Sequence, residues 1–508
     1  MFKRLTAAFC LLVLLSGCAS LPKDPKRIES HSIAANANSD LSEIFDPAIA
    51  AHPRRSGVVL LHEPEIALRA RDEMTTLAEH TLDVQYYIWS DDKVGRILTQ
   101  RLLDAADRGV RVRILLDDFT LNIDDIYLAA FSDHPNVELR LFNPFAHRTT
   151  KALGFITDIQ RVNQRMHNKI FVLDNKVAIV GGRNIGDNYF GVKDSYNSRD
   201  IDVLTIGPVV DDISKSFDEY WNSDWAYPIK NIYPHEISEE NNKLILKELK
   251  KQATLDRASL PFDLIRSKKE IVEGIRSNIK QLDWARIDVI FDPTEKLRGD
   301  TNTVAAQFET ALIGVNQEML AEIAYFVPGN ELVNDFKIAN DKGIHIRFLT
   351  NSLTSTEVLP AYAGFSSYRK DLLKAGVELY EYRSDAKERF TWPEPSHNAL
   401  TRLHSKTFVV DRQFSFIGSF NFDPRSVDLN TEIGLLIDSP EFAEKVIAVL
   451  DEGVLPGNAW KLELDSKANK IKWHDQEGST PLKKEPYSSW WQRVKATVLR
   501  ILPIESQL

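Results

Sequence analysis

Runs of hydrophobic residues between about residues 57 and 455 predict strands that alternate with helices. His80–Trp89 is rich in β-branched and aromatic residues, which is typical of a strand. Val94–Ala106 has the periodicity of an amphipathic helix, and Gly109 follows it as a helix-ending residue. Val110–Leu116 begins as an alternation and becomes fully apolar, as a buried strand does, and Val137–Phe142 predicts the next strand.

The same succession of segments returns in the second half of the chain. Three pairs of segments match in order: Asp83–Ile88 with Glu322–Val327, Asp107–Leu115 with Asn340–Leu349, and Asn136–Leu139 with Gly376–Leu379. Because helices alternate with strands in both halves, we expect the α/β fold class and a duplicated α/β unit.

Two further segments differ in pattern from these halves. Residues 229–282 form a highly charged insert or linker, in which Ser238–Lys251 predicts an exposed helix capped by Ser238. Residues 456–508 form a tail in which Ser488–Leu502 predicts a basic amphipathic helix with two tryptophans at its start. Such a helix suits a membrane interface, and an amphipathic helix docked on the protein is the alternative.

Composition narrows the class of protein. The chain has 508 residues, of which 43% are hydrophobic and 27% charged, so it is globular and long enough for two or three domains. Its formal net charge of −10 argues against a nucleic-acid-binding protein, which needs a basic surface. Two cysteines exclude a disulfide framework and a cysteine-rich zinc module.

The first twenty residues have the layout of a secretory signal. Two basic residues precede the apolar run Leu5–Leu15, which is too short to span a bilayer. The following Leu15-Ser-Gly-Cys18 resembles a bacterial lipobox, which implies cleavage before Cys18 and lipidation of its thiol. We therefore expect a signal peptide at 1–17, a lipid anchor and tether at 18–55, and a periplasm-facing lipoprotein of the bacterial cell envelope. An uncleaved anchor helix is the alternative.

One constellation of polar residues occurs in each half with identical spacing. A histidine is followed by a lysine at +2, an aspartate at +7 and an asparagine at +17. The two copies are His167, Lys169, Asp174 and Asn184, and His404, Lys406, Asp411 and Asn421. One copy is weak evidence in a chain of this length, but two copies in matched halves strongly indicate one shared site.

The residue types of this constellation suit phosphoryl transfer. The histidine and lysine of a His-x-Lys strand face the same side, so two such strands at a pseudo-two-fold axis place two cations and two imidazoles in one pocket. Lysines and asparagines stabilise phosphate oxygens, one histidine serves as nucleophile, and the other serves as proton donor. No metal and no cofactor is required by this set.

With this doubled motif, the chain from about residue 57 to 455 resembles the phospholipase D superfamily. The resemblance implies two tandem phospholipase D-like α/β/α units, at 56–228 and 283–455, that form a pseudo-two-fold bilobal protein. It implies that His167 attacks phosphorus and forms a phosphohistidine, while His404 protonates the leaving alcohol and then activates the acceptor. The pseudo-symmetry leaves the reverse assignment of the two histidines open.

The resemblance also implies roles for the other motif residues. Phosphate oxygens would be held by Lys169, Lys406, Asn184 and Asn421. The aspartates Asp174 and Asp411 complete the family's catalytic motif, although a turn-stabilising role is the favoured interpretation for both.

A nucleophilic histidine needs an acid that holds its other nitrogen. Glu432, which lies 28 residues after His404, matches the family's histidine-orienting acid. Asp200 stands at the corresponding place in the first half, with Asp202 as the alternative. An exposed salt bridge is the competing interpretation for either acid.

Several stretches around these motifs, including Val137–Phe145 and Gly418–Ser426, are similar to the bacterial cardiolipin synthase branch of the superfamily. That similarity implies transfer of a phosphatidyl group to phosphatidylglycerol, with phosphatidylethanolamine or a second phosphatidylglycerol as donor. The expected partners are these phospholipids and a membrane surface, without nucleic acid, and no oligomer is required to complete the site. A phospholipase D that uses water, a nuclease and an inactive membrane-tethered scaffold are the alternatives.

Overall fold

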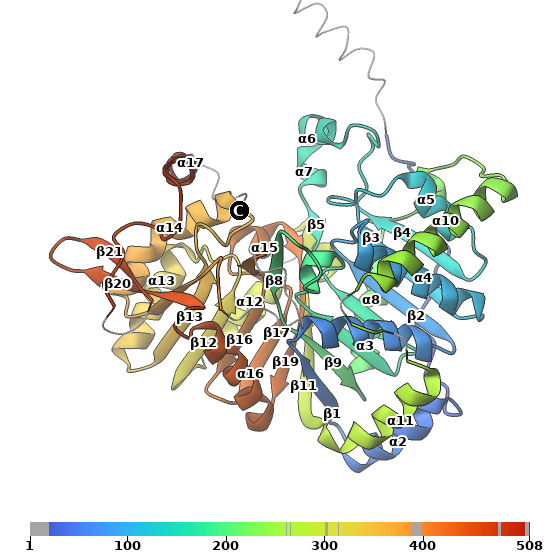
Figure 1. The fold of residues 1–508 in the computed structure, drawn as a ribbon, viewed down its shortest axis with the longest axis horizontal. Coiled ribbons are helices and arrows are strands. Elements are labelled where there is room, and N and C mark those ends of the chain that lie inside the picture. The colour runs from blue at the N-terminus through green and yellow to red at the C-terminus, as the bar shows by residue number, and fades with distance from the viewer. Residues whose placement is uncertain are drawn as a thin grey trace, which may run out of the picture.

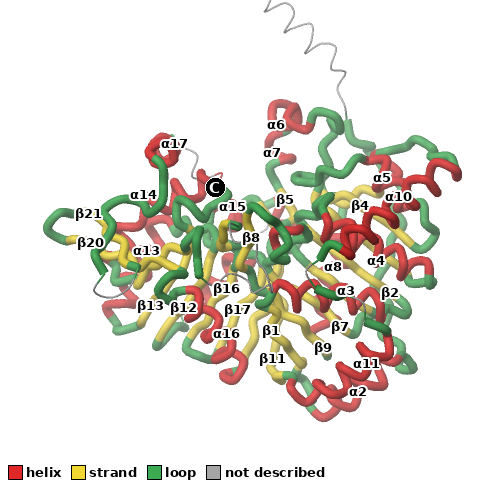
Figure 2. Tube along the Cα trace, in the orientation of Figure 1, coloured by secondary structure: helices red, strands yellow, loops and turns green. Residues whose placement is uncertain are grey.

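The computed structural model describes residues 20–507 except 261, 265, 300–302, 313, 388–398, 476–478 and 503–506. The predicted signal peptide at 1–17 and the lipidation site Cys18 lie outside the described residues. Two lobes stand side by side, each with strands inside and helices outside (Figures 1 and 2). We refer to residues 20–282 as lobe 1 and to residues 283–507 as lobe 2.

The sheet of lobe 1 combines parallel and antiparallel strands. Its hydrogen-bonded order is β10 (Ala226–Pro228), β4 (Val137–Phe142), β3 (Arg111–Asp117), β2 (Thr81–Tyr86), β6 (Ile170–Leu173), β7 (Val177–Gly181), β9 (Asp202–Ile206) and β1 (Ser56–Leu61). In this order β2, β3 and β4 run parallel to one another, and every other neighbouring pair is antiparallel. This is the α/β arrangement that the alternation of strands and helices predicts.

Helices cover both faces of this sheet because its strands are apolar on both faces. Along β6, Phe171 and Leu173 join the core beneath α3 (Pro64–Leu77), α4 (Lys93–Asp107) and α5 (Asp125–Ser132). The alternate residues Ile170 and Val172 join the core that contains α8 (Val209–Asn222).

Lobe 2 repeats this plan. Its strands follow the order β11 (Asp283–Phe291), β19 (Ile433–Asp438), β17 (Phe414–Gly418), β16 (Lys406–Val410), β12 (Glu318–Ile323), β13 (His345–Asn351), β14 (Glu378–Tyr382), β20 (Ala459–Asp465) and β21 (Lys470–His474). Its helices are α12 (Val304–Leu312), α13 (Gly329–Asp341), α14 (Leu359–Lys374), α15 (Pro424–Asp428), α16 (Pro440–Gly453) and α17 (Trp490–Ile501). The duplication and the α/β class are thereby confirmed.

The register of the duplication differs from the sequence match in one place. The carboxylate of Asp174 accepts the backbone N–H of Thr81, and that of Asp411 accepts the N–H of Glu318. The first residues of β2 and β12 are therefore equivalent, so Glu322 corresponds to Gln85 and not to Asp83. The sequence match was wrong by two residues, which is one strand repeat and leaves the same side chains facing the core.

The lobes join along β1 and β11, which pair antiparallel from Ser56 opposite Ala285 to Val58 opposite Asp283. Residues from both lobes share one buried apolar core around α8 and α16. Two short parallel sheets also cross the junction: β5 (Arg165–Met166) pairs with β18 (Asn430–Thr431), and β8 (Tyr196–Arg199) pairs with β15 (Leu400–Leu403).

The described part of the predicted anchor and tether, residues 20–55, packs on the rest of lobe 1 and contains a helix that was not predicted. The backbone N–H of Ser30 donates to Asn222 at 3.1 Å, and that of Ser32 donates to Asp218 at 2.7 Å. Helix α2 (Asp40–Ala51) follows, with Ser39 as its cap and with Leu41 and Phe45 buried. Burial of this apolar helix face explains why the polar composition of the segment misled the prediction.

The charged insert also belongs to lobe 1. Ser238 caps α10 (Glu239–Ala258), which begins where predicted and extends beyond Lys251. This helix packs on α4, where Arg96 pairs with Asp256 at 2.7 Å, and α11 (Lys268–Asn278) packs on α3.

Helix α17 packs on α14 and leaves its tryptophans outside. Ala496 is buried against lobe 2, whereas Trp490 and Trp491 are 60% and 65% exposed. The helix is thus docked on the protein and still presents an apolar surface to its surroundings.

Candidate active site

Each motif histidine stands between a short strand that crosses the lobe junction and a strand of its own lobe's main sheet. His167 lies between β5 and β6, and its backbone N–H donates to the carbonyl of Thr431 at 2.8 Å. His404 lies between β15 and β16, and its N–H donates to the carbonyl of Arg199 at 2.8 Å. The backbone of each histidine is therefore fixed by the other lobe.

The acid that contacts each motif histidine also comes from the other lobe. Nδ1 of His167 lies 2.8 Å from Oε2 of Glu432, and Nδ1 of His404 lies 2.6 Å from Oδ2 of Asp200. All four side chains are buried, with 6% exposure at most. This leaves Nε2 of each imidazole for chemistry. The spacing of Glu432 from His404 gave no sign that this acid holds the histidine of the other half.

Asp202, the alternative to Asp200, contacts arginines instead. Its carboxylate lies 2.9 Å from Arg71 Nη2 and 3.3 Å from Arg183 Nη1. This buried ion pair fastens strand β9 to α3.

The two motif lysines point back at their own histidines. Nζ of Lys169 donates to the carbonyl of His167, and Nζ of Lys406 donates to the carbonyl of His404. Burial lowers the pKa of Lys169 to about 7 and also lowers the pKa of Lys406. Burial disfavours the charged form of both lysines although Glu432 and Asp200 lie near them, so an anionic ligand would stabilise their positive charge.

Burial also changes the pKa of both motif histidines. It lowers the pKa of His167 well below the usual value, with the charges of Lys169 and Lys406 adding to the effect. Burial lowers the pKa of His404 too, against the opposing influence of Asp200. Both imidazoles are therefore neutral at neutral pH in the free enzyme.

The pKa values of the two acids shift in opposite directions. Burial raises the pKa of Glu432 to about 7, despite the opposing charge of Lys169. Burial by itself also raises the pKa of Asp200, but the charge and hydrogen bond of His404 outweigh it and lower the pKa to about 2. At neutral pH Asp200 is an anion, whereas Glu432 is partly protonated.

The motif asparagines present unpaired polar atoms. Asn184 accepts the backbone N–H of Ile88 at 3.1 Å, and its buried Nδ2 has no hydrogen-bond partner among the described residues. Within the same described residues, the buried Oδ1 of Asn421 has none either. A half-turn of that amide would exchange acceptor for donor. Because an unpaired buried amide is costly, both side chains are suited to a ligand that supplies the missing bonds.

The motif aspartates lie at the opposite strand ends from the histidines. Asp174 takes a positive φ of 49° and accepts the backbone N–H groups of Glu79, His80 and Thr81 at 2.6–3.0 Å. Asp411, with φ of 51°, accepts those of Asn316, Gln317 and Glu318 in the same way. Both carboxylates stabilise turns, as the favoured interpretation expects, so their inclusion among the reacting groups is corrected to a structural role.

Sequence reasoning missed the residues that surround the imidazoles and Glu432. Rings of Tyr87 and Tyr189 pack edge-on against His167 and His404, at centroid distances of 4.9 and 5.1 Å. The hydroxyls of Ser419 and Ser426 donate to Glu432. Ser419 stands inside Gly418–Ser426, one of the stretches that resemble the family, so its position was visible in the sequence although its partner was not.

Two features are absent from the part of the chain that the structure describes. None of the helices there is long and apolar enough to cross a bilayer. Nor do the described histidines, cysteines and acids form a group of three or more arranged to hold a metal ion.

Comparisons with known proteins agree with this geometry. Residues 73–225 and 311–453 match the family described as "Cardiolipin synthase, PLD-like domain". The chain is 39% identical over 472 residues to cardiolipin synthase C of Escherichia coli (strain K12), which covers 90% of this chain and 98% of that protein. It is 27% identical over 375 residues to cardiolipin synthase A of Pseudomonas syringae pv. syringae, covering 73% of this chain and 63% of that protein.

A solved structure shows the same fold at low identity. Phosphatidylserine synthase of Haemophilus influenzae Rd KW20 aligns with a TM-score of 0.56 at 13% identity, over 92% of this chain and 99% of that chain. The matched family segments contain both histidine–lysine motifs and both histidine-bound acids. The chain therefore belongs to the cardiolipin synthase family with a phospholipase D-like domain and is an enzyme of the phosphatidyltransferase type.

Proposed function

We propose that this enzyme makes cardiolipin by transferring a phosphatidyl group from phosphatidylethanolamine or phosphatidylglycerol to phosphatidylglycerol. The observation that carries the proposal is the pair of imidazoles, each held through Nδ1 by an acid of the other lobe, beside two buried lysines. Similarity to cardiolipin synthase C over most of both chains supports the choice of acceptor.

In the first step, Nε2 of His167 attacks the donor's phosphorus and forms an N–P bond. The bond from phosphorus to the head-group oxygen breaks. His404, which becomes an imidazolium when the anionic substrate binds, gives that oxygen its Nε2 proton. The free alcohol leaves, and the phosphatidyl group stays on His167 as a phosphohistidine. Lys169 and Lys406 balance the charge on the phosphate oxygens during this step.

In the second step, the now neutral His404 takes the proton of a phosphatidylglycerol hydroxyl. That oxygen attacks phosphorus, the N–P bond breaks, and cardiolipin forms with His167 restored. The low pKa of His167 favours the neutral nucleophile, and the ionised Asp200 stabilises an imidazolium at His404 when the substrate's negative charge enters.

We propose further that the active-site edge faces a lipid bilayer. In Figure 1, α6 (Gly154–Thr157) and α17 lie at the upper edge of the molecule, one on each lobe, and β5 and β8 lie below them between the lobes. Ile156 in α6 is 80% exposed, and Trp490 and Trp491 in α17 are exposed as well. Exposed aliphatic and tryptophan side chains with basic neighbours suit the interface of an anionic membrane. Lipidation of Cys18 and a periplasm-facing location are part of this proposal.

The test uses purified enzyme in mixed micelles of labelled phosphatidylethanolamine and phosphatidylglycerol, with each lipid also supplied alone. We expect cardiolipin only when phosphatidylglycerol is present, and the label identifies the donor. Phosphatidic acid without cardiolipin would contradict the proposal and identify a hydrolase that uses the same groups. The His167→Ala variant is the control for contaminating activity.

A further inference from the structure

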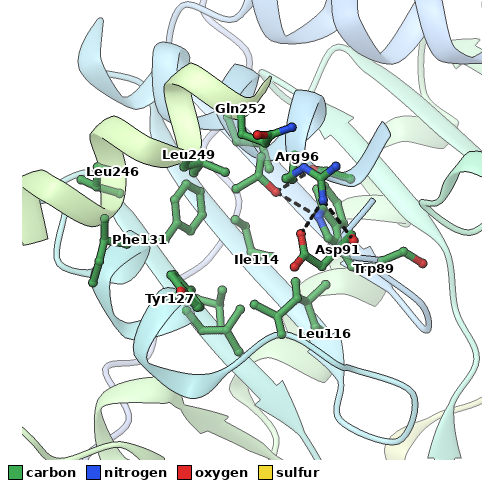
Figure 3. Close-up of a pocket in the computed structure, with 18 of the residues that line it drawn as sticks. Trp89, Asp91, Arg96, Ile114, Leu116, Tyr127, Phe131, Leu246, Leu249 and Gln252 are labelled. Carbon is green, nitrogen blue, oxygen red and sulfur yellow. Dashed lines mark hydrogen bonds and ion pairs between the residues drawn. The ribbon is translucent and has the colours of Figure 1, made fainter. Parts of the chain in front are cut away.

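Lobe 1 contains an apolar pocket of about 310 Å³ beneath the insert helix α10 (Figure 3). Apolar side chains that line it include Leu102 of α4, Ile114 and Leu116 of β3, Phe131 of α5, and Leu246 and Leu249 of α10. Polar side chains gather at one end, where Arg96 contacts Asp91 at 3.0 Å and Gln252 lies beside them (Figure 3). The pocket is therefore an apolar cavity with a polar rim, which is the usual make-up of a small ligand site.

The equivalent place in lobe 2 provides an internal comparison. The strand and helix registers pair Trp89 with Phe326, Ile114 with Phe348, and Leu102 with Phe336. In lobe 2 the three phenylalanines pack together, with centroid distances of 4.3 Å for Phe326–Phe348 and 5.4 Å for Phe336–Phe348. The duplicated fold thus fills this place with aromatic rings in one lobe and leaves it open in the other.

One short segment connects the pocket to the active site. The ring of Tyr87 contacts His167, and the backbone N–H of Ile88 binds Asn184. The next two residues, Trp89 and Ser90, line the pocket. Because a residue of extended chain spans at most about 3.6 Å, the Cα atom of Asp91 lies within roughly 11 Å of that of Ile88, whose N–H binds Asn184. A glycerol backbone can bridge such a separation between a phosphate and a fatty acyl chain.

We propose that this pocket binds one acyl chain of a phospholipid and that α10 is its roof. The proposal rests on the proposed function for its lipid substrate, and it assigns a role to the insert that the catalytic motifs do not need. Apolar walls suit methylene groups, and the volume lies at the lower end of ligand sites, which fits a single chain. The polar rim keeps the ester and glycerol end at the opening beside Trp89.

Binding is tested first, apart from catalysis, with cis-parinaric acid as a fluorescent acyl probe on the purified full chain. The Leu102→Phe/Ile114→Phe variant fills the pocket with the residues that lobe 2 uses at the equivalent positions. We expect saturable probe binding in the unchanged protein and at least tenfold weaker binding in the filled variant. Equal binding in the two proteins would overturn the proposal.

The matched control is Leu244→Phe, on the outward face of the same helix, where the side chain is 57% exposed. It should bind the probe like the unchanged protein. If the double variant fails to fold, as judged by its thermal melt, Leu249→Trp replaces it with Leu244→Trp as control, and the same difference is expected. Loss of binding in the control as well would contradict a site at this pocket.

Two further measurements separate a substrate chain from a bound regulatory lipid. If the chain belongs to the substrate, long-chain phosphatidylglycerol displaces the probe, and the filled variant raises KM for long-chain but not for dihexanoyl substrates. If the bound chain belongs to a lipid other than the substrate, the probe changes kcat without competing with the phospholipid substrate. That result also supports an acyl site in this pocket. Probe binding without any phosphatidyl transfer would leave the pocket in place and remove the proposed function. Phosphatidyl transfer together with equal probe binding in the filled and control variants would remove the acyl pocket and leave the proposed function in place.

Discussion

The half-sites of His167 and His404 share one backbone geometry but hold their acids differently. Around His167 the acid is Glu432, which also accepts hydrogen bonds from the hydroxyls of Ser419 and Ser426. Burial raises the pKa of Glu432 to about 7, so this acid carries only part of a negative charge at neutral pH.

Around His404 the acid is the shorter Asp200, and Gly182 stands where the other half-site has Ser419. A Cβ atom on Gly182 would lie 2.1 Å from Oδ1 of Asp200, so a serine does not fit there without movement. The backbone N–H of Ile201 donates to the same carboxylate at 2.9 Å. Asp200 stays ionised, with its pKa lowered to about 2.

This difference shows how a duplicated fold can divide one reaction between two copies of the same motif. At Glu432 burial outweighs the groups that favour the anion, among them the hydroxyl of Ser419, whereas at Asp200 the charge and hydrogen bond of His404 outweigh burial. The imidazole beside the weaker negative charge is the better neutral nucleophile, and the imidazole beside the stronger one holds a proton more readily.

The largest effect is expected from the histidines themselves. His167→Ala and His404→Ala should each reduce kcat by about 10⁴-fold or more, because residues that act as a unit are not additive in their losses. The measurement is phosphatidyl transfer in mixed micelles. Substantial turnover in either variant would break the shared-site account. The double variant should be no worse than either single one.

Substitution of the two histidine-bound acids should reduce kcat by different amounts. Asp200→Asn is expected to reduce kcat by about 10³- to 10⁴-fold, because it removes a full charge from beside an imidazolium. Glu432→Gln should cost about 10²-fold, because Glu432 is partly protonated already. Steady-state kinetics at neutral pH of the two amide variants give the comparison directly. The reverse order of the two losses would show that the charge asymmetry is wrong.

A pH profile tests the buried lysines of the two half-sites. The pKa of Lys169 is lowered from its ordinary value to about 7 by burial, so the free enzyme loses this positive charge as the pH rises through 7. We expect kcat/KM to fall above that pH, approaching about tenfold per pH unit. Lys169→Arg keeps its charge and should move this decline to higher pH. A profile that stays flat to pH 9 in the unchanged enzyme would contradict the assignment.

The smallest effect is expected where the neighbouring loops differ. Ser419→Gly removes one hydroxyl from Glu432 and should lower kcat about tenfold, which is the loss of one hydrogen bond to an ionisable group. Gly182→Ser, its counterpart, meets the carboxylate of Asp200 and should lower both kcat and the melting temperature. If Gly182→Ser were as active and stable as the unchanged enzyme, the close packing around Asp200 would not matter.

The residues of the cluster could be predicted because the spacing of each motif is local. His167 and His404 stand in two copies of one motif, and the alternation of strands and helices places each copy on a sheet. The cross-lobe pairing could not be predicted, because Glu432 lies near His404 in sequence but reaches His167 through a contact between lobes. Local periodicity carries no information about such pairs.

The same limit explains the other differences between prediction and structure. The segment that contains α2 is polar enough to suggest a tether, yet Leu41 and Phe45 are buried against lobe 1. The apolar pocket depends on Ile114 and Leu102 being smaller than Phe348 and Phe336, a comparison that needs the register of the duplication. The length of α10 was underestimated because its buried face, including Ala253, lies near its end.

The central claim is that His167 is the nucleophile and His404 the proton donor, and one measurement tests it most directly. The His404→Ala variant is mixed with a phosphatidyl substrate whose leaving group is p-nitrophenol, which needs no proton to depart. The enzyme is quenched at neutral to basic pH, digested, and searched for phosphohistidine by mass spectrometry. We predict a phosphatidyl adduct on His167 in this variant, and none in His167→Ala treated in the same way. An adduct on His404 in the His167→Ala variant, with none on His167 in the other, would contradict the account.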